Sequence, residues 1–430
     1  MTTLTTRPVR EVVTEMARSA RAASLAMARA TAEERQVALH GIADEIAGRA
    51  AEIVLANTVD LSNADENGIT GAMRNRLELD AVGVGRLAAA VREVAVQPDP
   101  LGGVEDEVVR PNGLRVGRMR IPLGVIAMIY ESRPNVTADA AALCLKAGNA
   151  VILRGGSEAI HTNRAIAEAI TAGLEASALP VAAVQLVPVT DRSAIDVLLE
   201  QEEWIDLVIP RGGEGLIRAV TEKSRIPVLQ HYKGVCHVFV DESAPLERAV
   251  AIVQNAKVQR PGVCNAAETL LVHSSAARQV LPAIANRLSQ DGVVLRACPA
   301  TVEILRSVAS DISMEPATED DWNAEYLDLT LAVRVVEGLE EAMDHIATYG
   351  SGHTEAIVTD DDDNASTFVR AIQSSTVLVN ASTRFADGGE LGLGAEIGIS
   401  TSKLHAYGPM GANELTTRKF VVFGEGQVRG

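Results

Sequence analysis

The chain has 430 residues, 47% of them hydrophobic and 22% charged, a composition typical of a globular protein with two or three domains. Its formal net charge of −18 argues against a nucleic-acid partner and against an anionic membrane surface, because both attract basic patches. Four scattered cysteines are too few for a disulfide framework, and no apolar stretch approaches the roughly 20 residues that span a bilayer, so we expect a cytoplasmic protein.

The first 98 residues are helical in pattern. From residue 10 to 98, apolar side chains recur at three- and four-residue spacing, with Thr31 and Asn57 as candidate caps or stops. The N-terminal stretch is rich in Arg, Ser and Ala, as transit peptides are, but Glu11 and Glu15 interrupt it and a second helical run follows directly. We therefore expect a surface helix here rather than a transit peptide.

A Pro- and Gly-rich break at 97–103 separates this helical start from the first β-like sequence. Two β-like runs flank Pro111-Asn112-Gly113, a turn sequence that favours a hairpin, which we place at 104–121. We predict that this hairpin and the C-terminal strand at 420–424 form a small oligomerisation element, because pairing with a neighbouring subunit would cover an exposed strand edge. The expected state is a homo-oligomer, with dimer and tetramer both open.

From residue 121 onward, short β-rich runs alternate with helical runs. The expected helices of the first half lie at 135–147, 158–176, 193–201 and 214–223, and a last strand is expected at 227–230. A second series runs from residue 235 to 380. This alternation predicts right-handed βαβ crossovers, so the fold class is α/β with two doubly wound domains. The predicted parts are a cofactor domain at 1–229, a catalytic domain at 230–385 and a C-terminal return at 386–430.

Two strand ends carry glycine-rich turns that suit a phosphate. Arg154 and Ser157 flank Gly155 and Gly156 after one predicted strand, and Gly212, Gly213 and Gly215 follow another. Ligands of open α/β sheets bind at the carboxyl ends of strands, and an arginine there can grip a 2′-phosphate. We place the two turns on neighbouring strands of one sheet and predict a dinucleotide, NADP rather than NAD. Either turn taken singly also fits a helix cap without a ligand.

Three of the four cysteines have ordinary explanations. Cys144 and Cys298 lie in apolar runs and are expected in the core. Cys236 lies near His231 and His237, which raises the question of a metal site. A structural zinc site needs four ligands, and no second ligand cluster at suitable spacing is evident, so we predict no metal.

Cys264 differs because it lies in a turn, between Pro261-Gly262 and an Asn-Ala-Ala stretch that leads into an apolar strand. In a turn the sulfur can be exposed and the residue's own N–H can remain available. A thiolate there can attack a carbonyl carbon, and the N–H can stabilise the oxyanion that forms. Cys264 is therefore the candidate nucleophile.

At this point the chain resembles a known family. The segment 122–135, the strand and glycine turn at 210–215 and the Gly-x-Cys-x-Ala turn at 262–266 occur in the order found in the aldehyde dehydrogenase superfamily. Within it, the chain is most similar to the gamma-glutamyl phosphate reductase family, whose signature resembles residues 336–357. The C-terminal run at 380–419 is also characteristic. Met343 and Tyr407 depart from the family pattern, in which we expect another aliphatic residue and an arginine.

The resemblance implies an aldehyde dehydrogenase-like fold and a reaction in proline biosynthesis. L-glutamate 5-phosphate would be reduced by NADPH to L-glutamate 5-semialdehyde with release of phosphate, through a thioester on Cys264. Asn135 matches the side-chain oxyanion donor, and Glu325 matches the residue that holds the nicotinamide ribose. The cofactor would also contact Arg154, Ser157, Gly212 and Gly213. The candidate cations for the substrate are Arg133, Lys257, Arg260, His353 and Arg384.

Gln230 stands where hydrolytic members of the superfamily carry a glutamate base. A carboxamide cannot take up a proton, so water would not be activated against the thioester. The absence of a glutamate base at position 230 favours acyl-phosphate chemistry. It equally permits an acylating aldehyde dehydrogenase that passes the acyl group to coenzyme A. A third alternative is a silent scaffold that holds a glutamate 5-kinase partner.

Overall fold

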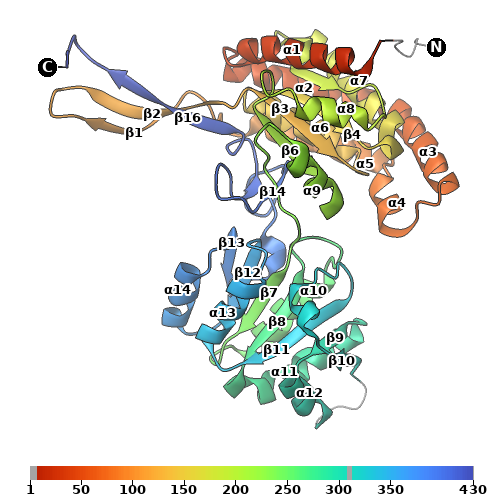
Figure 1. Ribbon diagram of the computed structural model, residues 1–430, viewed down its shortest axis with the longest axis vertical. Helices are drawn as coiled ribbons and strands as arrows, with labels where there is room; N and C mark the ends of the chain where they lie inside the picture. The colour runs from red at the N-terminus through yellow and green to blue at the C-terminus, as the bar shows by residue number, and fades with distance from the viewer. Residues whose placement is uncertain (1–6, 308–311, 430) are drawn as a thin grey trace. The chain divides into compact units, whose positions relative to one another are not determined.

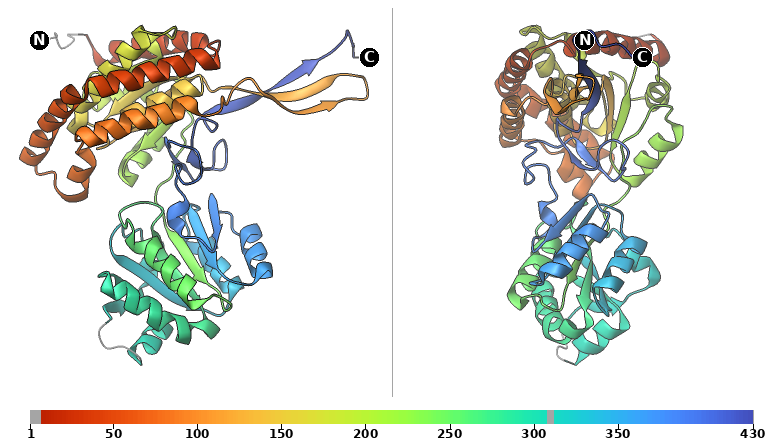
Figure 2. Two further views of the ribbon diagram at one scale, coloured as in Figure 1. Left: turned by 180° about the vertical axis from the view of Figure 1, so that it is seen from behind. Right: turned by 90° about the vertical axis from the view of Figure 1, so that its left-hand side faces the viewer.

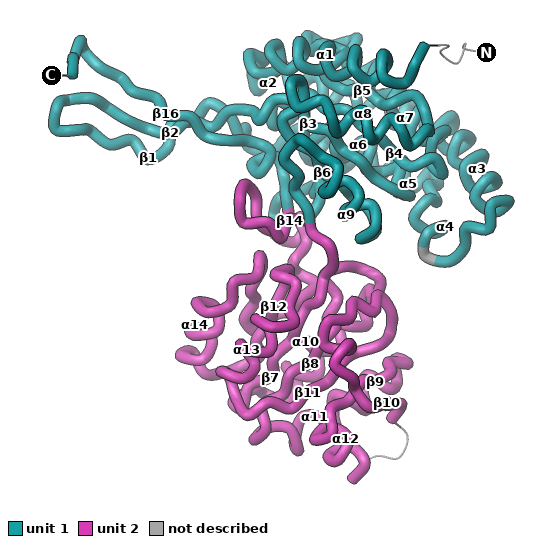
Figure 3. The backbone as a smooth tube through the Cα atoms, in the orientation of Figure 1, with its two compact units in different colours: residues 1–230, 392–398, 410–430 teal, residues 231–391, 399–409 magenta. Residues whose placement is uncertain are grey.

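The computed structural model describes residues 7–307 and 312–429 (Figure 1). The chain divides into two compact units (Figure 3). Unit 1 comprises residues 1–230, 392–398 and 410–430, and unit 2 comprises residues 231–391 and 399–409. The residues predicted as a separate C-terminal part, 386–430, are thus divided between the two units.

Unit 1 is built on a four-stranded parallel sheet with strand order β5-β4-β3-β6. Its strands are β3 Val125–Tyr130, β4 Ala150–Gly155, β5 Val184–Leu186 and β6 Leu207–Arg211. Every residue of β3 is buried, and because successive side chains face opposite sides, both faces of the sheet are covered. The prediction that the two glycine turns lie on neighbouring strands was wrong, since β3 lies between β4 and β6. The strand expected at 227–230 is reduced to a single bridge between Val208 and Val228.

Helices of unit 1 pack around this sheet. They are α1 Val9–Met27, α2 Ala32–Gly48, α3 Ala50–Glu66, α4 Gly71–Leu77, α5 Ala81–Val96, α6 Asn135–Lys146, η1 Ser157–Ala159, α7 Ile160–Glu175, η2 Val181–Ala183, α8 Ser193–Leu199 and α9 Glu214–Lys223. Thr31 caps α2 in a capping box with Glu34, as predicted. Asn57 is not a cap. It lies inside α3, where its buried amide bonds the backbone of Leu77 and Leu79.

A three-stranded antiparallel sheet joins the predicted hairpin to the C-terminal strand. Its strands are β1 Val104–Val109, β2 Arg115–Pro122 and β16 Thr416–Phe423, in the order β1-β2-β16. Strand β16 pairs with β2 over its whole length, from Thr416 opposite Pro122 to Phe423 opposite Arg115. Figure 2 shows the C-terminal strand beside the hairpin, extending away from the helices of unit 1. Its part in oligomerisation stays a prediction.

Unit 2 contains a seven-stranded parallel sheet with strand order β10-β9-β11-β8-β7-β12-β13. Its strands are β7 Cys236–Val240, β8 Ala267–His273, β9 Val294–Ala297, β10 Met314–Pro316, β11 Thr330–Val336, β12 Thr354–Val358 and β13 Thr376–Val379. Its helices are α10 Leu246–Val258, α11 Ser274–Gln290, α12 Pro299–Arg306, η3 Glu319–Asn323, α13 Leu339–Tyr349, α14 Asp362–Ala371 and η4 Thr383–Phe385. The short strands β14 Gly398–Ser400 and β15 Gly408–Met410 pair where the chain passes between the units.

Helices cover both faces of this sheet. Val238 and Val240 of β7 pack in a core with α10 and α11, whereas Phe239 between them packs on the other face with α13 and α14. This alternation is what a doubly wound sheet requires. Among the residues described, no helix combines the length and the apolar character that a bilayer crossing requires.

His345 of α13 makes the stability of unit 2 dependent on pH. Its ring is buried among His237, Trp322 and Tyr349, and burial, reinforced by the charges of His237 and Arg334, lowers its pKa to about 3. In the unfolded chain a histidine titrates near pH 6.5, so the unfolded state binds more protons between pH 3 and 6.5. The stability that the neutral ring contributes is therefore complete above pH 6.5 and falls as the pH drops, by about 2 kcal/mol at pH 5.

We expect wild-type protein to lose about 2 kcal/mol more unfolding free energy between pH 7 and 5 than a His345→Gln variant, whose amide oxygen can still accept from Arg334. Urea unfolding followed by Trp322 fluorescence, in a Trp204→Phe background, measures this difference in unit 2. Equal pH dependence in the two proteins would contradict the assignment.

Candidate active site

In unit 1, two carboxylates join the loops at the carboxyl ends of three strands. After β3, the N–H and Oγ of Ser132 donate to Oε1 of Glu158 at 2.6 and 2.8 Å, and Ser132 adopts a positive φ of 43°. Glu131 accepts from the N–H of Gly213, at the start of α9, at 3.0 Å. The loop that leads to Asn135 is therefore fixed from both sides, by the turn after β4 and by the turn after β6.

Asn135 is the first residue of α6, and its side chain is exposed. Its Nδ2 donates to Oδ2 of Asp139, one turn later, at 2.9 Å. Burial raises the pKa of Asp139 to about 6, against the opposing effects of the Asn135 hydrogen bond and of Arg211. Because an amide nitrogen carries two N–H groups, this bond orients the amide and directs its second N–H toward another acceptor.

The residues predicted to bind the cofactor fit that role unequally. A side chain at Gly212 would place its Cβ 2.4 Å from Oε2 of Glu131, whereas Gly213 has open space around it. Ser157 is exposed at the start of η1. These residues fit a turn that approaches phosphate closely.

Arg154 does not fit its predicted role as a cofactor-binding residue. Its side chain is buried, and its Nη1 and Nη2 donate to the carbonyl oxygens of Gly155 and Thr190 at 2.6 and 2.9 Å. Burial lowers the pKa of its guanidinium. The geometry therefore does not support the predicted 2′-phosphate contact, because the arginine supports the backbone at the end of β4.

In unit 2, Cys264 lies half-buried in the turn between α10 and β8. Among the hydrogen bonds of the described residues, none is donated by its N–H. The Cys236 thiol donates to the Cys264 carbonyl at 3.2 Å, and burial raises the Cys236 pKa well above its usual value, so Cys236 stays a thiol. Gly234 lies so close that a Cβ there would be 1.9 Å from the Cys264 carbonyl oxygen, hence only glycine fits.

Two histidines lie beside the Cys264 sulfur. One potential ligand atom from each of His231, Cys264 and His353 falls within 4.8 Å of the others. His353 is fully buried, and its Nδ1 contacts the Thr354 hydroxyl at 2.8 Å. His237, the other histidine near Cys236 in the sequence, does not join them, because its N–H and its Nδ1 both contact Glu355.

The three arginines among the predicted substrate cations are exposed or half-buried, whereas Lys257 is fully buried. Arg260 is exposed, and Arg384 donates to Gln259 at 2.7 Å. Burial lowers the pKa of Arg384, whose charge also interacts with Asp387, Arg260 and Cys264, so Arg384 lies within electrostatic range of the thiol. Arg133 is half-buried in the unit 1 loop before Asn135.

Lys257 does not fit as a substrate cation. It is fully buried, and its Nζ lies 2.6 Å from Oε2 of Glu268, which is also fully buried. Burial raises the pKa of Glu268 to about 7, and the ammonium of Lys257 opposes that rise. The ammonium thus neutralises an internal carboxylate and is not presented to a ligand.

Glu325 and Tyr407, two further positions singled out by the family resemblance, hold loops around Cys264 and His353. Glu325 accepts from the N–H of Gly234 at 2.8 Å. Tyr407, where the family pattern has arginine, donates to the carbonyls of Gly352 and Gln373. Position 407 therefore fastens the loop that precedes His353, which a hydroxyl can do without a charge.

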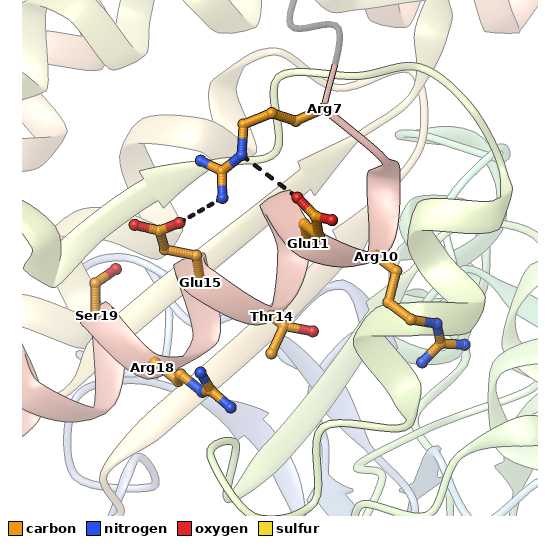
Figure 4. A pocket seen from close by; sticks show the side chains of 7 residues that line it. All are labelled: Arg7, Arg10, Glu11, Thr14, Glu15, Arg18 and Ser19. Atoms are coloured by element: carbon orange, nitrogen blue, oxygen red, sulfur yellow. Dashed lines mark hydrogen bonds and ion pairs between the residues drawn. The ribbon is translucent and has the colours of Figure 1, made fainter.

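A separate hollow lies along the exposed face of α1, lined by Arg7, Arg10, Glu11, Thr14, Glu15, Arg18 and Ser19 (Figure 4). Arg7 pairs there with Glu15 at 2.7 Å and with Glu11 at 3.8 Å. All three side chains are more than half exposed, so these pairs are those of a solvated helix face. The hollow contains none of the candidate site residues.

Comparison with known proteins identifies the family of this chain. The sequence model of the aldehyde dehydrogenase family matches residues 5–293. A gamma-glutamyl phosphate reductase from Desulfatibacillum aliphaticivorans is 57% identical over 98% of this chain and 99% of its own, and one from Geobacter metallireducens is 55% identical over the same shares. The crystal structure of the gamma-glutamyl phosphate reductase from Thermotoga maritima matches with a TM-score of 0.93 and 46% identity, over 97% of this chain and 100% of that one.

These similarities confirm the α/β fold class and the resemblance inferred from the motifs. The chain therefore belongs to the aldehyde dehydrogenase family and, within it, to the gamma-glutamyl phosphate reductases.

Proposed function

We propose that this oxidoreductase reduces L-glutamate 5-phosphate to L-glutamate 5-semialdehyde in proline biosynthesis, with Cys264 as the nucleophile. The observation that carries the proposal is the Cys264 turn. It combines a half-buried thiol, a backbone N–H without an acceptor among the described residues, and the charge of Arg384 within electrostatic range. Thiol attack on an acyl phosphate needs these three elements.

In the first step, the Cys264 thiolate attacks the 5-carbonyl carbon. The carbon–sulfur bond forms, and negative charge develops on the carbonyl oxygen, where the Cys264 N–H and the Asn135 amide stabilise it. The carbon–oxygen bond to phosphate then breaks and phosphate leaves, assisted by the charges of Arg260 and Arg384. A thioester remains on Cys264.

The family uses a nicotinamide cofactor, which when bound supplies the hydride that converts the thioester to the aldehyde and returns the thiolate. Gly212, Gly213 and Ser157 would hold its phosphates, and Glu325 its ribose. The preference for NADPH rests on the family resemblance rather than on Arg154, whose guanidinium is bound to backbone carbonyls.

Gln230 protects the thioester from hydrolysis in this scheme. Its side-chain oxygen contacts the Thr221 hydroxyl, and a carboxamide has no basic site for a water proton. Without an activated water, the thioester persists until hydride arrives in the forward direction, or phosphate in the reverse direction.

The reverse reaction tests the proposal. Purified protein is incubated with NADP and glutamate 5-semialdehyde, with inorganic phosphate, with coenzyme A, or with neither acceptor. NADPH formation that requires phosphate supports the proposal. NADPH formation that requires coenzyme A would identify an acylating dehydrogenase. NADPH formation without either acceptor would refute the role of Gln230. No NADPH formation under any condition would leave the scaffold alternative.

Replacing the side-chain oxyanion donor should slow the chemical step. We expect Asn135→Ala to lower kcat by roughly 10²-fold or more, because one preorganised donor is lost where charge develops. The KM for NADP should stay within about twofold, since the amide acts on the acyl oxygen. Steady-state kinetics of phosphate-dependent NADPH formation measure both.

The matched control is Asn63→Ala, which removes an exposed amide from α3 and should leave kcat unchanged. Wild-type kcat in the Asn135→Ala protein would assign the donor role to another group.

A further inference from the structure

The described residues His231, Cys264 and His353 form a cluster of potential metal ligands in unit 2, here named the His-Cys-His cluster. Each lies in the segment that leads into a strand, and the three strands β7, β8 and β12 are neighbours in the sheet. The two imidazole rings meet edge to face, with centroids 5.7 Å apart. His231 and Cys264 are half-buried, so an ion can reach them from solvent.

The surrounding contacts connect the loops that carry these side chains. The Cys236 thiol bridges the cluster, since it donates to the Cys264 carbonyl and lies 3.7 Å from Nδ1 of His353. Val235 donates its N–H to the Ser351 hydroxyl at 2.9 Å, which ties the His231 loop to the segment before His353. The close approach at Gly234 ties the same loop to the Cys264 turn. The three loops therefore bring the potential ligands close together, before any ion binds.

The ring of His353 is held by its neighbours. Its Nδ1 contacts the Thr354 hydroxyl, and a hydrogen bond on one ring nitrogen commonly orients a metal-ligating imidazole. The buried Cys236 sulfur lies 3.7 Å from the same Nδ1 atom of His353.

The donor set selects the metal. One thiolate and two imidazoles favour Zn²⁺, whereas Mg²⁺ and Ca²⁺ need oxygen ligands. Ligand atoms in a tetrahedral zinc site lie about 3.5 Å apart, so the present spacing of up to 4.8 Å closes onto an ion by a movement of roughly 1 Å. His231 can supply that movement, because it lies in an irregular loop outside any strand. Water would occupy the fourth position.

We propose that the His-Cys-His cluster binds one Zn²⁺ through Cys264, His231 and His353. The bound ion occupies the thiolate and blocks it reversibly. Binding follows from the geometry alone, whereas the inhibitory effect also rests on the proposed function of Cys264.

The test begins with zinc binding, which needs no substrate. Chelator-treated, reduced protein is titrated with ZnCl₂ in competition with a chromophoric chelator, and we expect one equivalent to bind. Cys264→Ser and His231→Ala should each weaken binding by about 100-fold or more, because each removes a ligand. His40→Ala, which changes a half-buried histidine of α2, should leave the affinity unchanged.

Two measurements on the wild-type protein keep the test independent of variant folding. Co²⁺ in place of Zn²⁺ should give a thiolate-to-cobalt charge-transfer band. Zinc should also protect Cys264 from alkylation by iodoacetamide, as read by peptide mass spectrometry. Absence of the band, alkylation of Cys264 that zinc does not slow, or equal zinc affinity in wild type and Cys264→Ser would each overturn the proposal.

Activity separates this inference from the proposed function. With zinc at ten times its dissociation constant, phosphate-dependent activity should fall about tenfold and return with excess chelator. Activity that zinc leaves unchanged, together with no zinc binding, would overturn the metal site and keep the proposed function. Zinc binding in a protein without semialdehyde activity would overturn the function and keep the metal site.

Discussion

A Cys264→Ser protein is expected to lose phosphate-dependent NADPH formation by about 10⁴-fold or more. A serine hydroxyl is not ionised near neutral pH and is a far weaker nucleophile than a thiolate, so the covalent step that splits the reaction in two is lost. Mass spectrometry after incubation with semialdehyde and NADP should show an acylated Cys264 peptide in the wild type and none in the variant.

Cys298→Ser is the matched control for this experiment. Cys298 is buried and caps α12, where its sulfur accepts from the N–H of Thr301, and serine is a good residue for that position. The control should keep both its melting temperature and its activity. Substantial activity in Cys264→Ser, with the control normal, would mean that another group forms the acyl intermediate or that none exists.

A Lys257→Met protein is expected to lose about 3–5 kcal/mol of unfolding free energy in unit 2, because it leaves the Glu268 carboxylate buried without its counter-ion. The double variant Lys257→Met/Glu268→Leu should recover most of this loss, since replacing both partners leaves no buried charge. Urea unfolding followed by Trp322 in the Trp204→Phe background measures both. Lys403→Met, at an exposed position of unit 2, should change the stability by less than about 0.5 kcal/mol.

The same variants decide whether Lys257 has a structural role or binds the substrate, as predicted from the sequence. If Lys257 held the substrate phosphate, Lys257→Met would raise the substrate KM with little loss of stability, and the double variant would stay impaired. Recovered stability together with a near-normal KM in the double variant would establish the buried pair as an internal support.

The alternation of strands and helices could be predicted because each element carries its own period of apolar residues. The order of strands could not, since it depends on pairing between distant segments. We therefore expected β4 and β6 to be neighbours, although β3 lies between them. The sequence around Arg154 shows an arginine beside glycines, but it does not show whether the guanidinium turns to a ligand or to the carbonyls of Gly155 and Thr190.

The Cys264 turn was predictable, and the family resemblance implied His353 at the same site, but the position of His231 beside the Cys264 sulfur was not predictable. The expectation that sites form at carboxyl ends of parallel strands suits unit 1, where Glu131, Ser132 and Gly213 follow their strands. In unit 2, His231, Cys264 and His353 precede the strands β7, β8 and β12, so the site lies at the amino ends of the strands, where that expectation does not apply. A search for histidine or cysteine in the segment that leads into each predicted strand would have found all three, but only the strand order brings them together.

The division of unit 1 along the chain determines when it can finish folding on the ribosome. Its β2 strand, Arg115–Pro122, is translated about 290 residues before its partner β16, which begins at Thr416. At translation rates of roughly 5–20 residues per second, about 15–60 s separate the synthesis of the two strands. During that interval, β2 presents an unpaired edge to other nascent chains and to chaperones. A truncation before residue 416 would make that exposure permanent.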